Sequence, residues 1–217
     1  MEKLSLCVPT PEQIRAYLSA DWWNWPQLEE TTRRAVDALC KRVVPRGGYR
    51  RLEHQQLQPL CVGKDIQRHL QHCDQGVLLW ATLGAEVDFL IRKAAVLDTV
   101  YSIVLDATAC AMAELLIEQV QDGQKEYYQK QGRFITGRFS PGYGDWPLEI
   151  HRYFAPFMGR DGITVTAQYL LLPTKSITAL CGVSDRPVTG YLAGCDTCAL
   201  RQDCNKRKEG VPCGANK

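Results

Sequence analysis

The sequence predicts an α+β fold, in which an antiparallel or mixed twisted sheet is flanked by helices and followed by a small cysteine-rich tail. Several segments carry apolar residues at helical spacing, and four shorter segments are apolar, alternating or β-branched in the manner of strands. Helices and strands do not alternate in a repeating βαβ rhythm, which favours an α+β arrangement over a parallel sheet.

The elements follow in order along the chain. Thr10 can cap a first helix over residues 10–18 with Pro11 in its first turn, and Pro45 with Gly47-Gly48 ends a second helix over 25–44. Further helices are predicted over 65–72, 85–97, 98–121 and 148–158, and strands over 49–57, 76–80, 164–172 and 176–183. The segment 132–147, rich in glycine, proline and aromatic residues, cannot be regular throughout.

Length and charge narrow the classes of protein to which the chain can belong. Its 217 residues suffice for one domain with an appendage, predicted as residues 1–190 and a tail of residues 191–217. The 26 basic and 24 acidic residues are too balanced for a large nucleic-acid or membrane footprint. Residues 1–9 lack the apolar core of a signal peptide, so we expect a cytoplasmic protein with no nucleic-acid or membrane partner.

The most apolar stretch, residues 97–120, is predicted to be a buried helix and not a membrane span. Four carboxylates interrupt it, at Asp98, Asp106, Glu114 and Glu118. Charges at that depth in a lipid-facing helix are expensive, so burial in the core of a soluble protein is the better interpretation.

The segment Arg138-Phe139-Ser140-Pro141-Gly142-Tyr143 is the strongest candidate for a binding site. It offers a permanent cation, a glycine where backbone can approach a ligand closely, and an aromatic face beside it. Those features suit a small molecule that has a carboxylate and a planar ring. Residue chemistry alone also allows a structural turn whose arginine pairs with a core carboxylate.

The pattern Arg-x-x-x-Gly-Tyr, with proline before the glycine, resembles the S-adenosylmethionine-binding motif of the activation domain of cobalamin-dependent methionine synthase. The resemblance implies that Arg138 binds the methionyl carboxylate and that the loop of Pro141, Gly142 and Tyr143 approaches the rest of the ligand. Three more segments match stand-alone members of that family and extend the resemblance over residues 10 to 183: residues 14–18, 82–88 and 173–179.

The resemblance also implies roles for residues outside the loop. Asp21 is the nearest candidate for an early ligand-contacting aspartate, and Tyr191 for a later tyrosine, although a plain surface tyrosine is the alternative. Glu114 is similar to a catalytic acidic residue near the sulfonium and the cobalt; the alternative is a solvated helix face shared with Glu118. Gly144-Asp145-Trp146 departs from the small residues that usually follow the Gly-Tyr pair.

The function implied by the resemblance is binding of S-adenosylmethionine and support of reductive remethylation of cob(II)alamin. The chain has no Asp-x-His-x-x-Gly cobalamin motif and no Gly-x-Gly-x-x-Gly, so a partner methionine synthase or corrinoid protein is expected to carry the cobalamin. Flavodoxin or ferredoxin is the expected class of electron donor. The chain would be a methyltransferase-type component that is not self-sufficient. Alternatives are an activator of another corrinoid methyltransferase and a metal-stabilised binding module without catalysis.

The tail carries a second candidate site. Cys195, Cys198, Cys204 and Cys213 match a tetrathiolate site for zinc or an iron–sulfur cluster, and the need to deliver an electron favours the cluster. Ten cysteines without a secretory signal do not predict a disulfide framework. Most of the other six cysteines are predicted to be small, buried apolar residues. A polar helix edge is a better interpretation of His69, His72 and Cys73 than a metal site.

Overall fold

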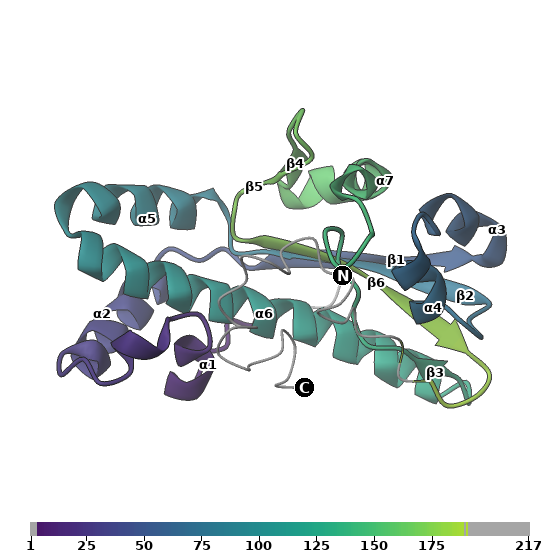
Figure 1. Ribbon diagram of the computed structural model, residues 1–217, viewed down its shortest axis with the longest axis horizontal. Coiled ribbons are helices and arrows are strands. Elements are labelled where there is room, and N and C mark those ends of the chain that lie inside the picture. Colours follow the sequence, from purple (N-terminus) through teal and green to yellow (C-terminus); the bar gives the residue numbers. More distant parts are fainter. Residues whose placement is uncertain (1–3, 189, 191–217) are drawn as a thin grey trace. The chain divides into compact units, whose positions relative to one another are not determined.

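The computed structural model of the protein describes residues 4–188 and residue 190 (Figure 1). The four tail cysteines Cys195, Cys198, Cys204 and Cys213 lie outside the described residues, as does Tyr191. Contacts divide the chain into two compact units. Among the described residues, the first unit contains 4–48, 79–122 and 155–177, and the second contains 49–78, 123–154, 178–188 and 190.

A sheet with helices on its faces confirms the predicted α+β class. The four-stranded sheet has the order β1-β2-β6-β3, with bounds Arg46–Glu53, Gln75–Thr82, Ser176–Ser184 and Phe134–Ile135. Strand β3 pairs antiparallel with β6, so that Phe134 lies opposite Ser184 and Ile135 opposite Val183. Residues 76–82 and 178–184 are buried without interruption, as expected for strands covered on both faces.

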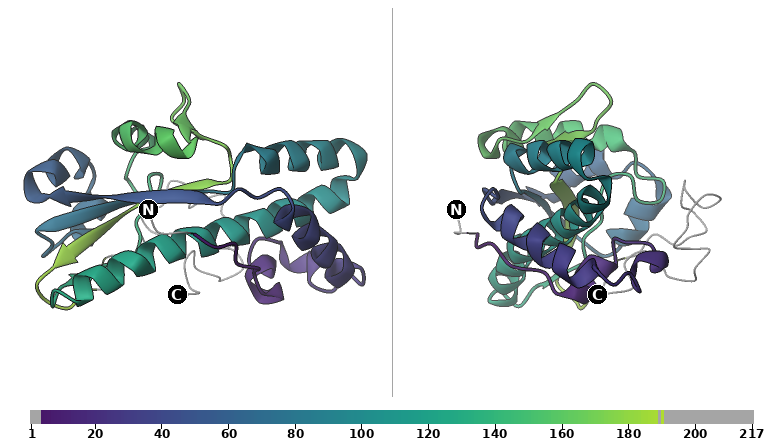
Figure 2. Two further views of the ribbon diagram at one scale, coloured as in Figure 1. Left: turned by 180° about the vertical axis from the view of Figure 1, so that it is seen from behind. Right: turned by 90° about the vertical axis from the view of Figure 1, so that its left-hand side faces the viewer.

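The helices that belong to the first unit begin with a strong local signal. Thr10 accepts a hydrogen bond from the Gln13 backbone, and Gln13 Oε1 accepts one of 2.8 Å from the Thr10 backbone, which forms a capping box for α1. Both views of Figure 2 show α1 next to α2, and a hollow of about 500 Å³ is lined by residues of these two helices and of the segment before them. The elements wholly in this unit are α1 (Pro11–Arg15), η1 (Ala20–Trp22), α2 (Leu28–Cys40), α5 (Ala85–Leu97), η4 (Gly159–Asp161), β4 (Thr164–Val165) and β5 (Leu171–Leu172).

The second unit contains shorter helices. They are α3 (His54–Leu57), η2 (Gln58–Leu60), α4 (Lys64–His69) and η3 (Leu148–Ile150). Two helices pass from one unit into the other along the chain: α6 (Thr99–Gln129) and α7 (His151–Met158).

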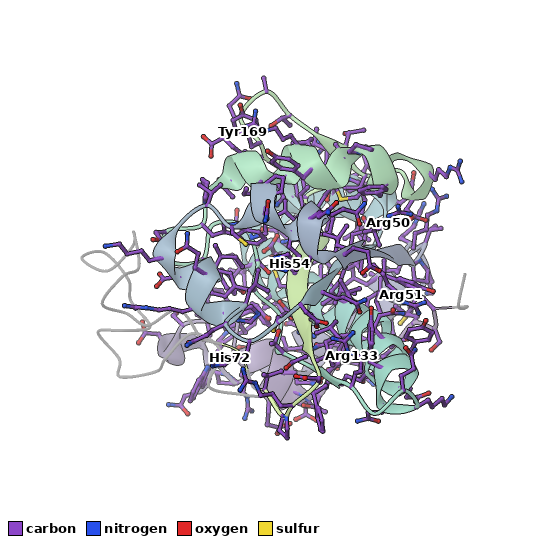
Figure 3. The ribbon with its side chains drawn as sticks, turned by 90° about the vertical axis from the view of Figure 1, so that its right-hand side faces the viewer. Arg50, Arg51, His54, His72, Arg133 and Tyr169 are labelled. Atoms are coloured by element: carbon purple, nitrogen blue, oxygen red, sulfur yellow. The ribbon has the colours of Figure 1, made fainter. Side chains whose placement is uncertain are left out.

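Helix α6 ends eight residues later than predicted, because tertiary contacts hold its polar C-terminal end. Gln124 Oε1 accepts a hydrogen bond of 3.0 Å from Arg51 Nε, and the Arg51 guanidinium carbon lies 3.2 Å from the centroid of the Tyr127 ring. Arg133, just beyond the helix, donates to Gln75 Oε1 at 2.8 Å and forms an ion pair with Asp74. Figure 3 labels Arg51 and Arg133 in this region of the second unit. A cation over an aromatic face and a buried amide hydrogen bond stabilise a turn of helix that its polar sequence does not favour.

The start of β1 differs from the prediction for a similar reason. Gly47 and Gly48, expected to stop a helix, lie inside the strand. A Cβ atom at Gly47 would come 2.6 Å from the backbone oxygen of Trp80, and one at Gly48 would come 2.8 Å from the Trp80 ring. The two glycines therefore let β1 approach a buried tryptophan closely.

The prediction of one strand over residues 164–172 is wrong. The structure has a hairpin there, in which β4 and β5 pair antiparallel with Thr164 opposite Leu172. Between them Thr166 N donates to Leu170 O at 2.8 Å, and Tyr169 has a φ of +61°. A left-handed residue of this kind reverses the chain, and the alternation of the sequence does not reveal it.

Helix α6 is the one helix in the described chain that is long and apolar enough to cross a membrane by length and composition. Within its most apolar 18-residue window, 61% of the residues are buried inside the protein. Core helices of globular proteins pass the same test.

Candidate functional site

The candidate loop, residues 138–147, is anchored through Phe139 to Leu180 of β6, and both residues belong to the second unit. The Phe139 backbone N–H donates to Leu180 O at 3.0 Å, and Leu180 N–H donates back to Phe139 O at 2.8 Å, so the loop begins as a short antiparallel bridge to β6. Phe139 is 1% exposed. Phe139 therefore has a fixed position, and Arg138 and Ser140 are its neighbours along the chain.

Aromatic packing around Phe139 fixes the position of the loop. The Phe139 ring lies 5.0 Å from the His69 ring and 5.8 Å from the Trp146 ring, centroid to centroid. Trp146 Nε1 donates a hydrogen bond of 2.8 Å to the Leu60 backbone oxygen, and the indole is buried. Edge-to-face rings and a satisfied indole N–H give this turn a rigid base.

The backbone of the loop closes on itself around Gly142. Gly142 N–H donates to Trp146 O at 2.8 Å, and Trp146 N–H donates to Tyr143 O at 3.0 Å. Gly142 has a φ of +92°, and a Cβ atom there would approach Leu148 Cδ2 to 3.2 Å. The position therefore requires glycine both for its conformation and for its space.

Asp145 ties the loop to the start of α4. Its carboxylate accepts hydrogen bonds from the backbone N–H groups of Lys64, at 2.7 Å, and Asp65, at 3.0 Å. Partial loss of water contact favours the neutral acid, but these hydrogen bonds outweigh it and lower the pKa of Asp145. The sequence Gly144-Asp145-Trp146, which departs from the family pattern, thus supplies both a helix cap and a buried anchor in this protein.

Asp65 is a residue that the sequence did not single out. It is 1% exposed, and its two carboxylate oxygens accept no hydrogen bond from the described residues; Arg68 Nη1 lies 3.9 Å away. Gly144 packs directly against this carboxylate, and any side chain at Gly144 would collide with it. No sequence signal marks Asp65, because its burial results from the folding of residues 143–146 over the start of α4.

The groups that the loop presents are those predicted for ligand binding. Gly142 and Tyr143 are exposed, the latter by 51%, whereas Pro141 is buried and Arg138 half-buried. The Tyr143 ring contacts Phe139 edge-on at 5.9 Å between centroids. Arg138 lies near enough to Cys181 to oppose the effect of burial, which raises the pKa of that thiol to about 12. The loop therefore carries a half-buried guanidinium, an exposed glycine and a half-exposed aromatic ring within six residues.

Two of the other predicted ligand residues lie in the first unit, and the third, Tyr191, lies outside the described residues. Asp21 is exposed in η1, and Glu114 is half-buried in α6. Of the predicted residues that the structure describes, four therefore share one loop and two come from separate elements.

The predicted metal signals in the described part of the chain do not form a cluster. No group of three or more His, Cys, Asp or Glu side chains in residues 4–188 and 190 is arranged to hold a metal ion. His69 is buried, and its Nε2 lies 3.0 Å from Thr136 Oγ1, so it belongs to the core and not to a polar helix edge. His72 Nδ1 lies 2.6 Å from an Arg186 guanidinium nitrogen.

Two of the segments that carried the family resemblance meet in the first unit. Leu83 N–H donates to Lys175 O at 3.0 Å, and Ser176 Oγ donates to Thr82 Oγ1 at 2.8 Å. The buried Asp88 carboxylate accepts from both Thr174 N–H and Thr174 Oγ1, each at 2.7 Å. These segments hold the start of α5 to the turn before β6, which is a structural role.

Comparison with known proteins adds one relationship. No model of a known protein family matches the chain, and no curated protein matches it. Among solved structures, one match is the "Crystal Structure of the MetH Reactivation Domain bound to AdoHcy", with a TM-score of 0.56 and 17% sequence identity. The match covers 96% of this chain and 86% of that chain. The chain therefore shares the fold of the MetH reactivation domain.

Proposed function

We propose that this chain binds S-adenosylmethionine on the loop of Arg138, Pro141, Gly142 and Tyr143 and supports the reductive remethylation of cob(II)alamin on a partner methionine synthase. The observation that carries the proposal is the likeness in fold to the MetH reactivation domain bound to AdoHcy, over 96% of this chain. AdoHcy, S-adenosylhomocysteine, is what S-adenosylmethionine becomes when its methyl group leaves.

Arg138 supplies the charge complement to the ligand. S-adenosylmethionine carries a carboxylate at one end, and a planar guanidinium binds a carboxylate through two parallel hydrogen bonds. Because Phe139 is buried and paired with Leu180, the Arg138 backbone starts from a fixed position. A guanidinium on a fixed backbone loses less freedom on binding than one on an unrestrained loop.

Gly142 and Tyr143 supply the contact surface. Gly142 is exposed, has a positive φ and carries no side chain, so a ligand can approach the main chain closely there. The half-exposed Tyr143 ring beside it offers an aromatic face for the apolar parts of the ligand. Asp145 and Trp146 keep these two residues in place through α4 and Leu60.

Asp21, Glu114 and Tyr191 are proposed as further contributors on the family resemblance. A carboxylate at Glu114 would stabilise the positive sulfonium, as opposite charges attract strongly where water is scarce. Asp21 would contact the ligand, as would Tyr191 in the C-terminal segment.

The reaction places few demands on acid–base groups of this chain. One electron reduces the cobalamin held by the partner, which then accepts the methyl group from the sulfonium, and S-adenosylhomocysteine is left on this chain. The residues named above hold the sulfonium methyl in line and keep water and other nucleophiles away, which is catalysis by positioning. A flavodoxin or ferredoxin is the proposed source of the electron.

The four tail cysteines are proposed to bind a metal. Cys195, Cys198, Cys204 and Cys213 have the number of thiolates that zinc or an iron–sulfur cluster requires. Visible absorbance and metal analysis after anaerobic purification decide between the two. A colourless protein with one zinc per chain would remove the cluster, and a protein without bound metal would remove the site.

The function is tested by mixing the protein with cob(II)alamin-loaded methionine synthase, a chemical reductant and S-adenosylmethionine, without oxygen. We expect the absorbance of cob(II)alamin to fall and that of methylcobalamin to rise, and Arg138→Ala to abolish this change. Loss of cob(II)alamin only with another corrinoid protein would identify a different partner. No change with any corrinoid protein, although S-adenosylmethionine binds, would leave a binding module without this activity and would refute the proposal.

A further inference from the structure

A lysine, a cysteine and an aspartate form a cluster in the first unit that the proposed function does not use. Lys175 Nζ lies 3.2 Å from Cys110 Sγ and 2.8 Å from Asp106 Oδ1. Cys110 Sγ lies 3.8 Å from Asp106 Oδ2, one helical turn away on α6. The Lys175 side chain is 13% exposed and Cys110 is only partly buried, so a small oxidant can reach the sulfur.

The backbone on both sides of this contact is fixed. Lys175 O accepts the hydrogen bond from Leu83 N–H, and the preceding Thr174 is held twice by Asp88. Cys110 lies within the regular part of α6. The folded backbone therefore holds Lys175 Nζ next to Cys110 Sγ, and no loop has to close to bring the two atoms together.

The protonation of the pair follows from its surroundings. Burial raises the pKa of Cys110, and the ammonium of Lys175 opposes that shift. Burial also favours the neutral amine, but Cys110 and Asp106 outweigh it and raise the pKa of Lys175. At neutral pH the resting pair is thus a thiol beside an ammonium.

We propose that Cys110 and Lys175 form a covalent crosslink when the protein meets a peroxide. The Cys110 thiolate attacks hydrogen peroxide: the sulfur loses two electrons, the O–O bond breaks, and sulfenic acid and water form after proton transfer. The Lys175 ammonium gives a proton to water or to Asp106, and its nitrogen attacks the sulfenic sulfur. An S–N bond forms, the S–O bond breaks, and the hydroxyl leaves as water with a proton from the nitrogen.

The net change is the loss of one hydrogen atom from each side chain and the conversion of one peroxide to two waters. A second peroxide that inserts an oxygen atom into the S–N bond yields an N–O–S bridge between the same two side chains and one more water. Either product joins α6 to the turn before β6. Thiol reductants reverse the link, because a thiolate attacks the electron-poor sulfur.

The test is peptide mapping of the full chain after treatment with excess hydrogen peroxide. A mildly alkaline buffer is used, since a thiol of raised pKa reacts faster as its thiolate fraction grows. We expect a crosslinked peptide pair containing Cys110 and Lys175, with the combined mass less two hydrogens, or that mass plus one oxygen. Dithiothreitol should restore the two separate peptides. Cys40, which is exposed on α2, reports that peroxide has acted.

Matched variants make the result decisive. Lys175→Arg keeps the charge beside Asp106 but lacks an amine that condenses with sulfenic acid, so Cys110 should appear as sulfenic acid trapped by dimedone, or as sulfinic acid. Lys93→Arg, at an exposed position on α5, should still give the crosslink. Recovery of Cys110 as free thiol or as sulfinic acid in the wild-type protein, while Cys40 is oxidised, would overturn the proposal. So would a crosslink that persists in Lys175→Arg.

Discussion

Trp146 Nε1 donates a hydrogen bond of 2.8 Å to the backbone oxygen of Leu60, across 86 residues of sequence. This contact and the two hydrogen bonds of Asp145 join the candidate ligand loop to the segment around α4. The loop is therefore a folded part of the second unit whose shape exists before a ligand binds. Predictions about stability and about binding can be made from the same residues.

Trp146→Phe should keep the aromatic packing against Phe139 but leave the Leu60 oxygen without its donor. We expect a loss of about 1–3 kcal/mol in the free energy of unfolding, the cost of an unsatisfied buried acceptor. Urea denaturation measures it. Trp23→Phe, at a position 49% exposed, is the matched control and should change the free energy little. Equal losses in both variants would contradict this reading of the loop.

Asp145→Asn tests how the loop responds to pH. Because the folded pKa of Asp145 is lowered, its carboxylate contributes stability above the unfolded pKa of about 3.9, and this contribution is lost as pH falls through the folded pKa. Wild type should therefore be more stable than Asp145→Asn at pH 7, and the difference should shrink below about pH 4. Urea titrations from pH 7 to pH 3 check this. Asp37→Asn, at an exposed position of α2, is the matched control for the substitution itself.

Gly142→Ala should weaken both folding and binding. The substitution forces a Cβ atom onto a residue with φ of +92° and against Leu148, which costs roughly 1–3 kcal/mol in the free energy of unfolding. Gly132→Ala is the matched control, since Gly132 also has a positive φ, of +69°, but open space around it. Both variants should lose stability, and only Gly142→Ala should lose affinity for S-adenosylmethionine. A similar loss of affinity in both would place the effect outside the loop.

Asp88→Ala removes a buried carboxylate that holds Thr174 through two hydrogen bonds in the first unit. Hydrogen bonds to charged groups are strong, so we expect a loss of about 2–4 kcal/mol in the free energy of unfolding. Asp88→Asn retains an acceptor and should recover part of it. If Asp88→Ala is as stable as wild type in urea denaturation, the segments 82–88 and 173–176 are not joined as described.

The sequence predicts elements well where local signals decide them. Helix α5 was predicted at residues 85–97 and is found at Ala85–Leu97, and the strand predicted at 176–183 is β6. Two of the errors occur where distant residues decide. The end of α6 depends on Arg51 and the start of β1 on Trp80, and neither contact is visible in a local window of sequence.

The candidate site divides in the same way. A short sequence motif predicts the chemistry of Arg138, Gly142 and Tyr143, and the structure places these residues in one loop. The contacts that hold this loop in place cannot be predicted from the sequence, because Phe139 contacts His69, and Asp145 contacts Lys64, only after folding. Asp65 is buried by the same folding and carries no mark in the sequence.

Isothermal titration calorimetry with S-adenosylmethionine and S-adenosylhomocysteine tests the central claim most directly. We expect the wild-type protein to bind both ligands, and Arg152→Ala, which alters an exposed arginine of α7, to bind each ligand with the affinity of wild type. Arg138→Ala should lose at least a factor of about 10 in affinity, the value of one charge-assisted carboxylate contact. Absence of binding by the wild-type protein, or undiminished binding by a folded Arg138→Ala variant, would contradict the account.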